Sequence, residues 1–148
     1  MKTPLTFLLL LTFLFLFSGS VYGEEPEIKR EYWGKGKLYK EIHFKNKKRE
    51  GLTTWWYESG EKWYEEHYKN GKKEKLETTW YKNGRKKLSQ RYKNGHLEGM
   101  KTEWHESGKK KSTSHYKNGI ENGFRKNWDE DGKLTFQGNF VNGVEEIK

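Results

Sequence analysis

Histidine is the residue type in this chain that would most readily bind a metal or move a proton. His43 and His67 lie 24 residues apart, and His115 follows 48 residues after His67. If the chain forms strands, this spacing places equivalent residues two strands apart, roughly 9–10 Å from each other. A zinc ion holds its ligands at about 2.1 Å, so two such imidazoles cannot share one ion. We expect exposed histidines and no metal site.

The serine and acidic residues do not form a recognisable catalytic arrangement either. A nucleophilic enzyme needs Ser, Thr or Cys beside an oriented base, but the chain has no Cys and no Gly-x-Ser-x-Gly turn. Adjacent carboxylates such as Glu65 and Glu66 would point to opposite faces of a strand and cannot act on one bond. A G-x-x-x-x-G-K-[ST] phosphate loop is also absent. We therefore expect no enzymatic activity and no cofactor.

The elements that carry these residues repeat along the chain. Glycines recur every 24 residues, at Gly36, Gly60, Gly84, Gly108 and Gly132. An aromatic residue stands four positions before each of them, at Tyr32, Trp56, Trp80, Trp104 and Trp128. A second series consists of Phe44, Tyr68, Tyr92, Tyr116 and Phe140, followed two residues later by Asn46, Asn70, Asn94, Asn118 and Asn142. Several registers at one spacing indicate five copies of one unit, roughly over residues 28–143.

Each unit contains two turns, and their residues are explained by turn geometry. Both turns read as three residues ending in Gly, which suits a type I turn followed by a left-handed glycine. The structural turn residues in this interpretation are Gly60, Gly84, Gly108, Gly132, Asn70, Asn94 and Asn118. Lys47 and Lys75 stand where other units have Gly. We therefore expect less regular second turns in the first two units.

The loop length also predicts which residues share a face. With Glu58 to Gly60 as the loop, Trp56 pairs with Lys62, Thr54 with Tyr64 and Leu52 with Glu66. Even-numbered strand residues then lie on one face throughout. That face would carry the candidate binding residues Trp56, Tyr68, Trp80, Tyr92, Trp104, Tyr116 and Trp128. The odd-numbered face would be basic, with Lys73, Lys101 and Arg125 among its residues, interrupted by a few aromatics such as Trp33, Tyr57 and Tyr81.

These features predict an all-β fold, an elongated single-layer antiparallel meander of about five 24-residue β-hairpin repeats. About ten short strands should run from Ile28 to Phe140 and extend roughly 45–50 Å at the usual strand spacing. Cross-strand aromatic ladders would supply the cohesion that a closed core normally gives. The short charged tail from Val144 could protect the last edge.

The pattern Tyr-x-Asn-Gly-x-x-x-Gly-x-x-x-x-Trp-x-x-x-Gly resembles the MORN-repeat variant family, a group often described as YwqK-type antitoxins. Tyr92, Asn94, Gly95, Gly99, Trp104 and Gly108 carry the match, as do Tyr116, Asn118, Gly119, Gly123, Trp128 and Gly132. The resemblance implies an elongated sheet of hairpins that acts as a binding scaffold. The antitoxin description implies a partner toxin, although a signal peptide is unexpected in a cytoplasmic antitoxin.

The N-terminus has the features of an export signal. Lys2 precedes a 13-residue apolar run, Leu5 to Phe17, and small residues lead to the charged segment that begins at Glu24. This run is shorter than the about 20 residues of a membrane span, so it predicts a secretory signal peptide over residues 1–23. Cleavage would follow Gly23 or Ser20, and an uncleaved anchor is the alternative. The repeat domain would then occupy residues 24–148, in a secreted, periplasmic or cell-envelope protein.

The net charge and the aromatic content indicate which classes of partner the chain could bind. The chain has a formal charge of +9, and 16% of its residues are aromatic. A protein partner is the main expectation, because Trp, Tyr and Arg dominate binding hot spots. An anionic membrane surface or glycan is the alternative, since net positive charge draws a protein to such surfaces. Stacking on single-stranded nucleic acid is a further use of such residues, but export argues against it.

Overall fold

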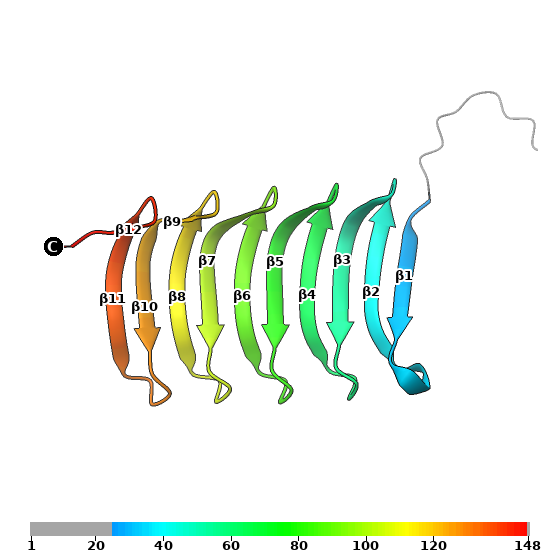
Figure 1. Ribbon diagram of the computed structural model, residues 1–148, viewed down its shortest axis with the longest axis horizontal. Coiled ribbons are helices and arrows are strands. Elements are labelled where there is room, and N and C mark those ends of the chain that lie inside the picture. Colours follow the sequence, from blue (N-terminus) through cyan, green and yellow to red (C-terminus); the bar gives the residue numbers. More distant parts are fainter. Residues whose placement is uncertain (1–24, 148) are drawn as a thin grey trace, which may run out of the picture.

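The computed structural model describes residues 25–147, which form one antiparallel β-sheet (Figure 1). The long strands are β1 (Glu27–Tyr32), β2 (Leu38–Lys45), β3 (Lys48–Trp56), β4 (Lys62–Lys69), β5 (Lys72–Trp80), β6 (Lys86–Lys93), β7 (His96–Trp104), β8 (Lys110–Lys117), β10 (Gly123–Trp128) and β11 (Leu134–Val141). Two short strands, β9 (Ile120–Glu121) and β12 (Val144–Glu145), and one 3-10 turn, η1 (Gly34–Gly36), complete the sheet. Long strands lie side by side in chain order, which confirms the predicted meander.

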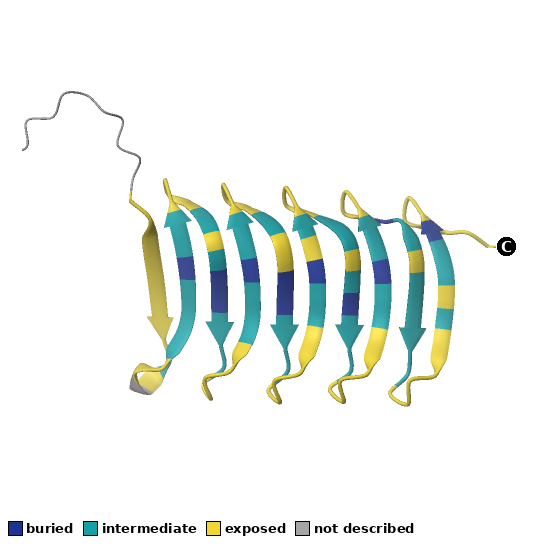
Figure 2. Ribbon diagram, turned by 180° about the vertical axis from the view of Figure 1, so that it is seen from behind, coloured by how far each residue is buried: buried dark blue, intermediate teal, exposed yellow. Residues whose placement is uncertain are grey.

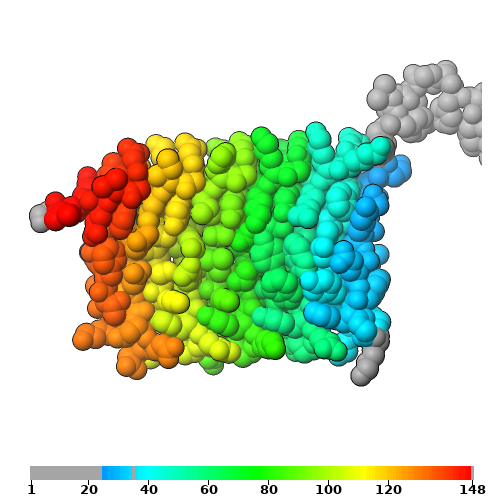
Figure 3. Space-filling model, viewed as in Figure 1, coloured from blue at the N-terminus to red at the C-terminus, as the bar shows by residue number. Residues whose placement is uncertain are grey.

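The sheet is a single layer, and no described element lies over the face seen in Figure 1, whose side chains Figure 3 shows, or over the face seen from behind in Figure 2. From β2 to β8 its buried residues form a band across the middle of the strands (Figure 2), whereas Glu121 and Phe140 in the last unit lie near the Asn-Gly turns. Only Ile42 and Phe140 are buried hydrophobic residues in the described part of the chain. The other buried positions are polar or charged, and they include Thr53, Thr54, Glu66, Glu77, Thr78 and Gln90. Burial in this fold therefore comes from neighbouring strands of the same sheet.

The Asn-Gly turns join the upper ends of the strands in Figure 1 and contain two residues, not the expected three. Lys69 pairs with Lys72, so the loop is Asn70 and Gly71 alone. Both loop residues have positive φ, 50° and 79°, as a type I′ turn requires. Asn tolerates this region and Gly occupies it without steric cost, which explains the dipeptide. We refer to the row of these turns, at residues 46–47, 70–71, 94–95, 118–119 and 142–143, as the Asn-Gly edge.

The other turns contain three residues, as predicted. At Glu58 to Gly60, the Tyr57 amide donates to the Glu61 carbonyl at 2.8 Å, and the Gly60 amide donates to the Tyr57 carbonyl at 2.9 Å. Gly60 has a φ of 107°. The same pair of hydrogen bonds recurs in the turns that end at Gly84, Gly108 and Gly132. We refer to the row of these turns, at residues 58–60, 82–84, 106–108 and 130–132, as the three-residue-turn edge.

A β-bulge beside each of these turns makes the expected register wrong beyond the first pair. Trp56 pairs with Lys62 as predicted, but Trp55 pairs with Tyr64, which leaves Trp63 as an extra residue. Thr54 consequently pairs with Glu65 rather than Tyr64, and Leu52 with His67 rather than Glu66. One extra residue reverses the facing of every residue beyond it. Even-numbered residues therefore do not share one face.

A second irregularity lies near the Asn-Gly edge, where Gly51, Gly99 and Gly123 have positive φ. Lys75 takes the same conformation, with a φ of 64°, and Lys47 keeps the turn geometry with a φ of 60°. Our expectation that Lys47 and Lys75 make the second turns less regular is therefore wrong. The surrounding hairpins hold both lysines in a region that a side chain disfavours.

The ends of the sheet differ from its middle. The β1 edge is exposed along its whole length. At the other end β12 pairs with β11 through Val144 and Glu145, so the tail covers part of the last edge. The predicted signal peptide, residues 1–23, lies outside the described residues. Within residues 25–147, helix η1 is far too short to cross a membrane.

The left-handed conformation of Lys75 predicts a stabilising substitution. Lys75→Gly should raise the free energy of unfolding by up to about 1 kcal/mol, because Gly occupies positive φ without steric cost. The reverse change in the equivalent position, Gly99→Ala, should lower it by about 1–2 kcal/mol. Urea denaturation of both variants checks the pair. A Lys75→Gly variant less stable than the parent would contradict this interpretation.

Candidate functional site

Successive units are joined at the three-residue-turn edge by one recurring side-chain hydrogen bond. The Tyr57 hydroxyl donates to the Trp80 carbonyl at 2.8 Å, and the Tyr81 hydroxyl donates to the Trp104 carbonyl at 2.7 Å. Trp33 and His105 hold the equivalent positions and contact the carbonyls of Trp56 and Trp128 at 3.1 and 2.9 Å. Because a carbonyl only accepts, His105 Nε2 must carry a proton. We expected Trp33, Tyr57 and Tyr81 only as interruptions of a basic face, although they share the 24-residue spacing.

A second recurring link joins the units at the Asn-Gly edge. The carboxylates of Glu50, Glu74 and Glu98 accept hydrogen bonds from the backbone amides of Asn70, Asn94 and Asn118, at 2.6, 2.7 and 2.8 Å. The turn glycines also donate to the preceding unit, as Gly71 does to the Arg49 carbonyl at 2.8 Å. We did not expect a role for this Glu series from the sequence, although its 24-residue spacing could have identified it.

A network of buried charges occupies the middle of one face, here called face A and defined by Thr53, Glu66, Glu77 and Gln90. Glu66 and Glu77 are only 3% and 4% exposed. Lys73 Nζ lies 2.9 Å from Glu66 and 2.5 Å from Glu77, and the Tyr64 hydroxyl lies within 2.6 and 2.9 Å of the same two carboxylates. Gln90 donates to Glu77 at 2.6 Å. These contacts satisfy two carboxylates that would otherwise be costly to bury.

The network changes the protonation of its members. Burial raises the pKa of Tyr64, and its hydrogen bond to Glu66 raises that pKa further. Burial alone would lower the pKa of Lys73, but hydrogen bonds to Glu77 and Glu66 outweigh it, so this pKa is raised. Both groups therefore keep their protons to a higher pH in the folded chain than in the unfolded chain.

The second aromatic series lies on face A and makes internal contacts. The Tyr68 hydroxyl donates to Glu66 at 2.8 Å, and the Arg49 guanidinium lies 5.0 Å from the Tyr68 ring. Lys73 Nζ lies 5.0 Å from the Tyr92 ring, and Tyr116 pairs with Gly99 and Glu121. Cation–π contacts of this kind hold neighbouring strands together. Lys73, Lys101 and Arg125, which we expected on the opposite face, therefore share face A with the tyrosines.

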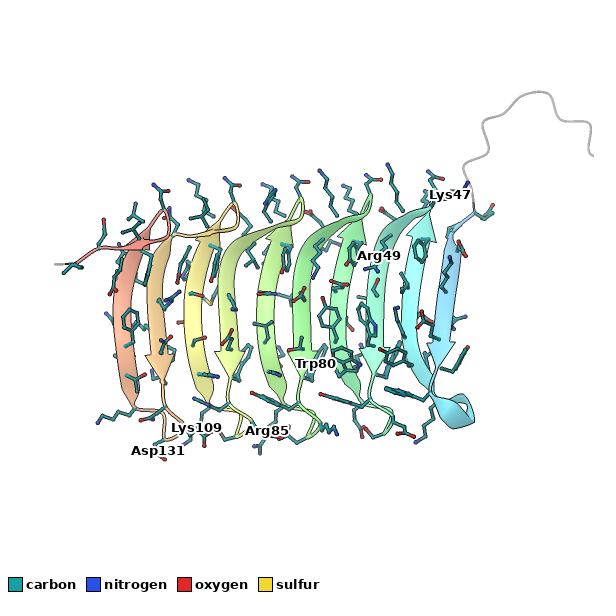
Figure 4. All side chains as sticks on the ribbon, in the orientation of Figure 1. Lys47, Arg49, Trp80, Arg85, Lys109 and Asp131 are labelled. Atoms are coloured by element: carbon teal, nitrogen blue, oxygen red, sulfur yellow. The ribbon has the colours of Figure 1, made fainter. Side chains whose placement is uncertain are left out.

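The tryptophan series lies on the opposite side, here called face B and defined by Leu52, Leu76, Met100 and Phe124. Because Trp55 shares face A with Tyr64, the next residue, Trp56, alternates to face B. The equivalent residues Trp80, Trp104 and Trp128 follow the same pattern, each half-buried at the end of its strand, as the label of Trp80 shows in Figure 4. The expected single surface of Trp56, Tyr68, Trp80, Tyr92, Trp104, Tyr116 and Trp128 is thus divided between two faces.

A row of exposed apolar side chains crosses face B. Leu76, Met100 and Phe124 are 47%, 52% and 60% exposed, and each occupies the same position in its unit. Arg91 and His115 pair with Leu76 and Met100, so cationic or titratable side chains separate the apolar ones. Between Trp128 and Phe124 the face is hollowed, and His115, Lys110 and Met100 also line this depression. We refer to Leu76, Met100 and Phe124 as the apolar row.

The two turn edges differ in charge. Exposed lysines recur along the Asn-Gly edge at Lys45, Lys48, Lys69, Lys72, Lys93 and Lys117. The three-residue-turn edge mixes both signs, and its cations contact neighbouring turns (Figure 4). Arg85 donates to the Ser107 carbonyl at 2.7 Å, and Lys109 donates to the Asp131 carbonyl at 3.1 Å. The exposed charged side chains of the Asn-Gly edge are therefore mainly lysines.

The raised pKa values of Tyr64 and Lys73 predict alkaline destabilisation. Above about pH 10, the unfolded chain loses these protons while the folded chain retains them, so stability falls as the pH rises. Urea denaturation between pH 8 and 12 should show this loss. Tyr64→Phe should lose less stability over that range than Tyr32→Phe, which removes an exposed tyrosine. Identical pH profiles for the two variants would refute the assignment to Tyr64.

Comparison with known protein families adds an independent result. The pattern described as "MORN repeat variant" matches residues 28–46, 49–70, 97–118 and 121–142, which together make up more than half of the chain. The unmatched stretch between the second and third ranges forms the β5–β6 hairpin, which has the same turns and links as its neighbours. A comparison with curated proteins finds no match. The chain belongs to the MORN repeat variant family.

Proposed function

We propose that this chain is a non-enzymatic repeat scaffold that binds a protein partner through face B. The observation that carries the proposal is the apolar row, in which Leu76, Met100 and Phe124 are about half exposed in three successive units. Isolated exposed apolar residues are ordinary, but three that recur on one uncovered face, with Arg91 and His115 on the strands between them, give the mix of apolar and polar groups that interaction surfaces have. Face A is a poorer candidate, because its tyrosines and carboxylates are engaged with one another.

The surroundings of the apolar row fit a protein interface. Trp80 pairs with Lys86 and Trp104 with Lys110, so each half-buried indole is bordered by an exposed ammonium group. Interfaces combine an apolar centre with a polar rim, and tryptophan is enriched among the residues that dominate binding energy. Because the strands are already paired in one hydrogen-bonded sheet, a partner that binds it would have to order little backbone.

We further propose that the chain acts outside the cytoplasm, in a secreted, periplasmic or cell-envelope setting, on the basis of the signal-peptide pattern in residues 1–23. The role we favour is immunity-like: the sheet would hold a partner protein, as the antitoxin description of similar repeats implies. No catalytic step is part of this role, because binding alone would block the partner.

A charge placed in the apolar row should abolish partner binding while the sheet stays folded. Met100→Glu puts a carboxylate at the centre of the row, and desolvating it in an interface should weaken binding at least 100-fold. The matched control is Ile120→Glu, which changes an equally exposed apolar residue of β9, beside the Asn-Gly edge and outside the apolar row. The measurement is capture of partners from the envelope fraction of the source cells by each tagged variant, with circular dichroism to confirm folding.

A partner captured by the parent and by Ile120→Glu but not by Met100→Glu supports the proposal. Equal capture by all three proteins would contradict it. Replacing Trp80 and Trp104 by Ala then asks whether the indoles contribute to the same surface.

The runner-up function is binding of an anionic envelope lipid or glycan, favoured by the lysines of the Asn-Gly edge. About 0.5 M salt reduces the screening length to roughly 4 Å, so retention by charge alone should collapse. Lys69→Glu with Lys72→Glu should weaken such retention and leave a face B partner bound. Protein capture that persists in high salt counts against the runner-up.

A further inference from the structure

A groove on face A lies near the three-residue-turn edge and crosses the second to fourth units. Its volume is about 370 Å³. Tyr57, Trp63 and Tyr81 line it with aromatic rings, Leu88 contributes an aliphatic surface, and Lys87 and Lys111 contribute ammonium groups. Trp80 and Trp104, whose carbonyls accept from Tyr57 and Tyr81, also line it. None of these residues belongs to the apolar row, which lies on face B.

The β-bulges create this groove. In each unit the bulge adds one side chain to face A, and its type changes along the sheet from Tyr39 to Trp63, Lys87 and Lys111. In the first two units the added ring packs on an aromatic neighbour, with centroids 4.5 Å apart for Trp33 and Tyr39 and 6.3 Å apart for Tyr57 and Trp63. In the third unit only the Lys87 chain lies over Tyr81, at 5.6 Å. The face is therefore lower beside Trp63, where the thinner Lys87 chain replaces an aromatic ring.

The groove has two lysines, Lys87 and Lys111, and one carboxylate, Glu103, with which Lys111 interacts electrostatically. Neither Lys87 nor Lys111 lies within salt-bridge distance of a carboxylate among residues 25–147. Glu103 also lines the groove, but it is paired with Lys101 at 2.7 Å and accepts from Ser112 at 3.2 Å. An occupant that brings its own carboxylates would therefore be favoured.

The hydrogen-bonding groups of the groove are largely in use. The hydroxyl protons of Tyr57 and Tyr81 are donated to the carbonyls of Trp80 and Trp104. A sugar would need several free donors and acceptors for its hydroxyl groups, whereas an apolar side chain needs only the rings and Leu88. The chemistry of the surface favours a bulky apolar group over a carbohydrate.

The groove also continues across the strands. A second depression of about 340 Å³ shares Glu103 and Lys111 with it and extends to Tyr116 and Arg125. Arg125 is paired with Glu121, so this extension is polar and hydrogen-bonding rather than apolar. An elongated occupant can therefore place an apolar side chain at Trp63 and continue over Lys111 toward the last units.

From these observations we propose that face A holds a second binding site, which takes an extended acidic peptide segment of a protein. A Leu or Phe side chain of the segment occupies the space between Tyr57, Trp63 and Tyr81. Its flanking Asp or Glu carboxylates pair with Lys87 and Lys111. The site lies on the face opposite the apolar row, so changes at Lys87 and Lys111 test it separately from the Met100→Glu test of face B.

The test uses the capped peptide acetyl-Glu-Asp-Leu-Phe-Asp-Glu-amide as the probe. Heteronuclear NMR titration should shift the indole N–H of Trp63 and the methyl groups of Leu88, with dissociation in the millimolar to micromolar range that short exposed sites support. The test variant is Lys87→Glu with Lys111→Glu. The control is Lys86→Glu with Lys110→Glu, which makes the same charge change at the adjacent, equally exposed residues that face the opposite side.

We expect the test variant to weaken binding at least 10-fold and the control variant to change it by less than 3-fold. Both variants alter exposed side chains, and amide spectra that match the parent will show that the sheet is intact. Equal weakening in the two variants would mean non-specific attraction to net charge and would overturn the proposal. Equal binding of a peptide with Lys in place of its acidic residues, tighter binding of an oligogalacturonate, or no shift at Trp63 at millimolar peptide would also overturn it.

Discussion

The structure depends on one constraint, which is that a single-layer sheet has no interior in which to bury a hydrophobic core. A two-layer domain buries one face of each layer against the other. Residues 25–147 contain no second layer, and their only buried hydrophobic residues are Ile42 and Phe140. The contacts that stabilise the fold must therefore form between each hairpin and the next. Each unit contacts mainly its neighbours, as in other repeat proteins.

Three sets of recurring contacts join each hairpin to the next, one at each turn edge and one in the middle of face A. Tyr57 and Tyr81 bind the carbonyl of the next unit at the three-residue-turn edge, and Glu50 and Glu74 bind the next turn at the Asn-Gly edge. Between them lies the charged network of face A around Lys73. Because face A uses its polar groups to hold the units together, face B is left to carry the apolar row. The groove beside Trp63 and the depression that continues toward Arg125 are hollows on face A beside this network.

The 24-residue period was enough to predict the all-β meander, the three-residue turns and the turn roles of Gly60 and Asn70. It did not predict the register, because the bulge at Trp63 leaves no mark in the spacing: a repeated bulge preserves the period while it reverses the facing of the strand. The division of Trp56 and Tyr68 between two faces follows from that single residue. The links of Tyr57 and Glu50 could have been found, since both recur at the same period, but their partners depend on the register.

Hydrogen bonds between equivalent positions of successive units stabilise the open sheet. The most direct measurement is the free energy of unfolding, by urea denaturation, of Tyr57→Phe, Tyr81→Phe and the double variant, with Tyr32→Phe as the control. Each single variant should lose about 1 kcal/mol, because it removes one hydrogen bond and leaves a carbonyl unpaired, and the double variant should lose about twice that. If Tyr57→Phe and Tyr81→Phe were as stable as the control, the hydrogen bonds between units would not stabilise the sheet.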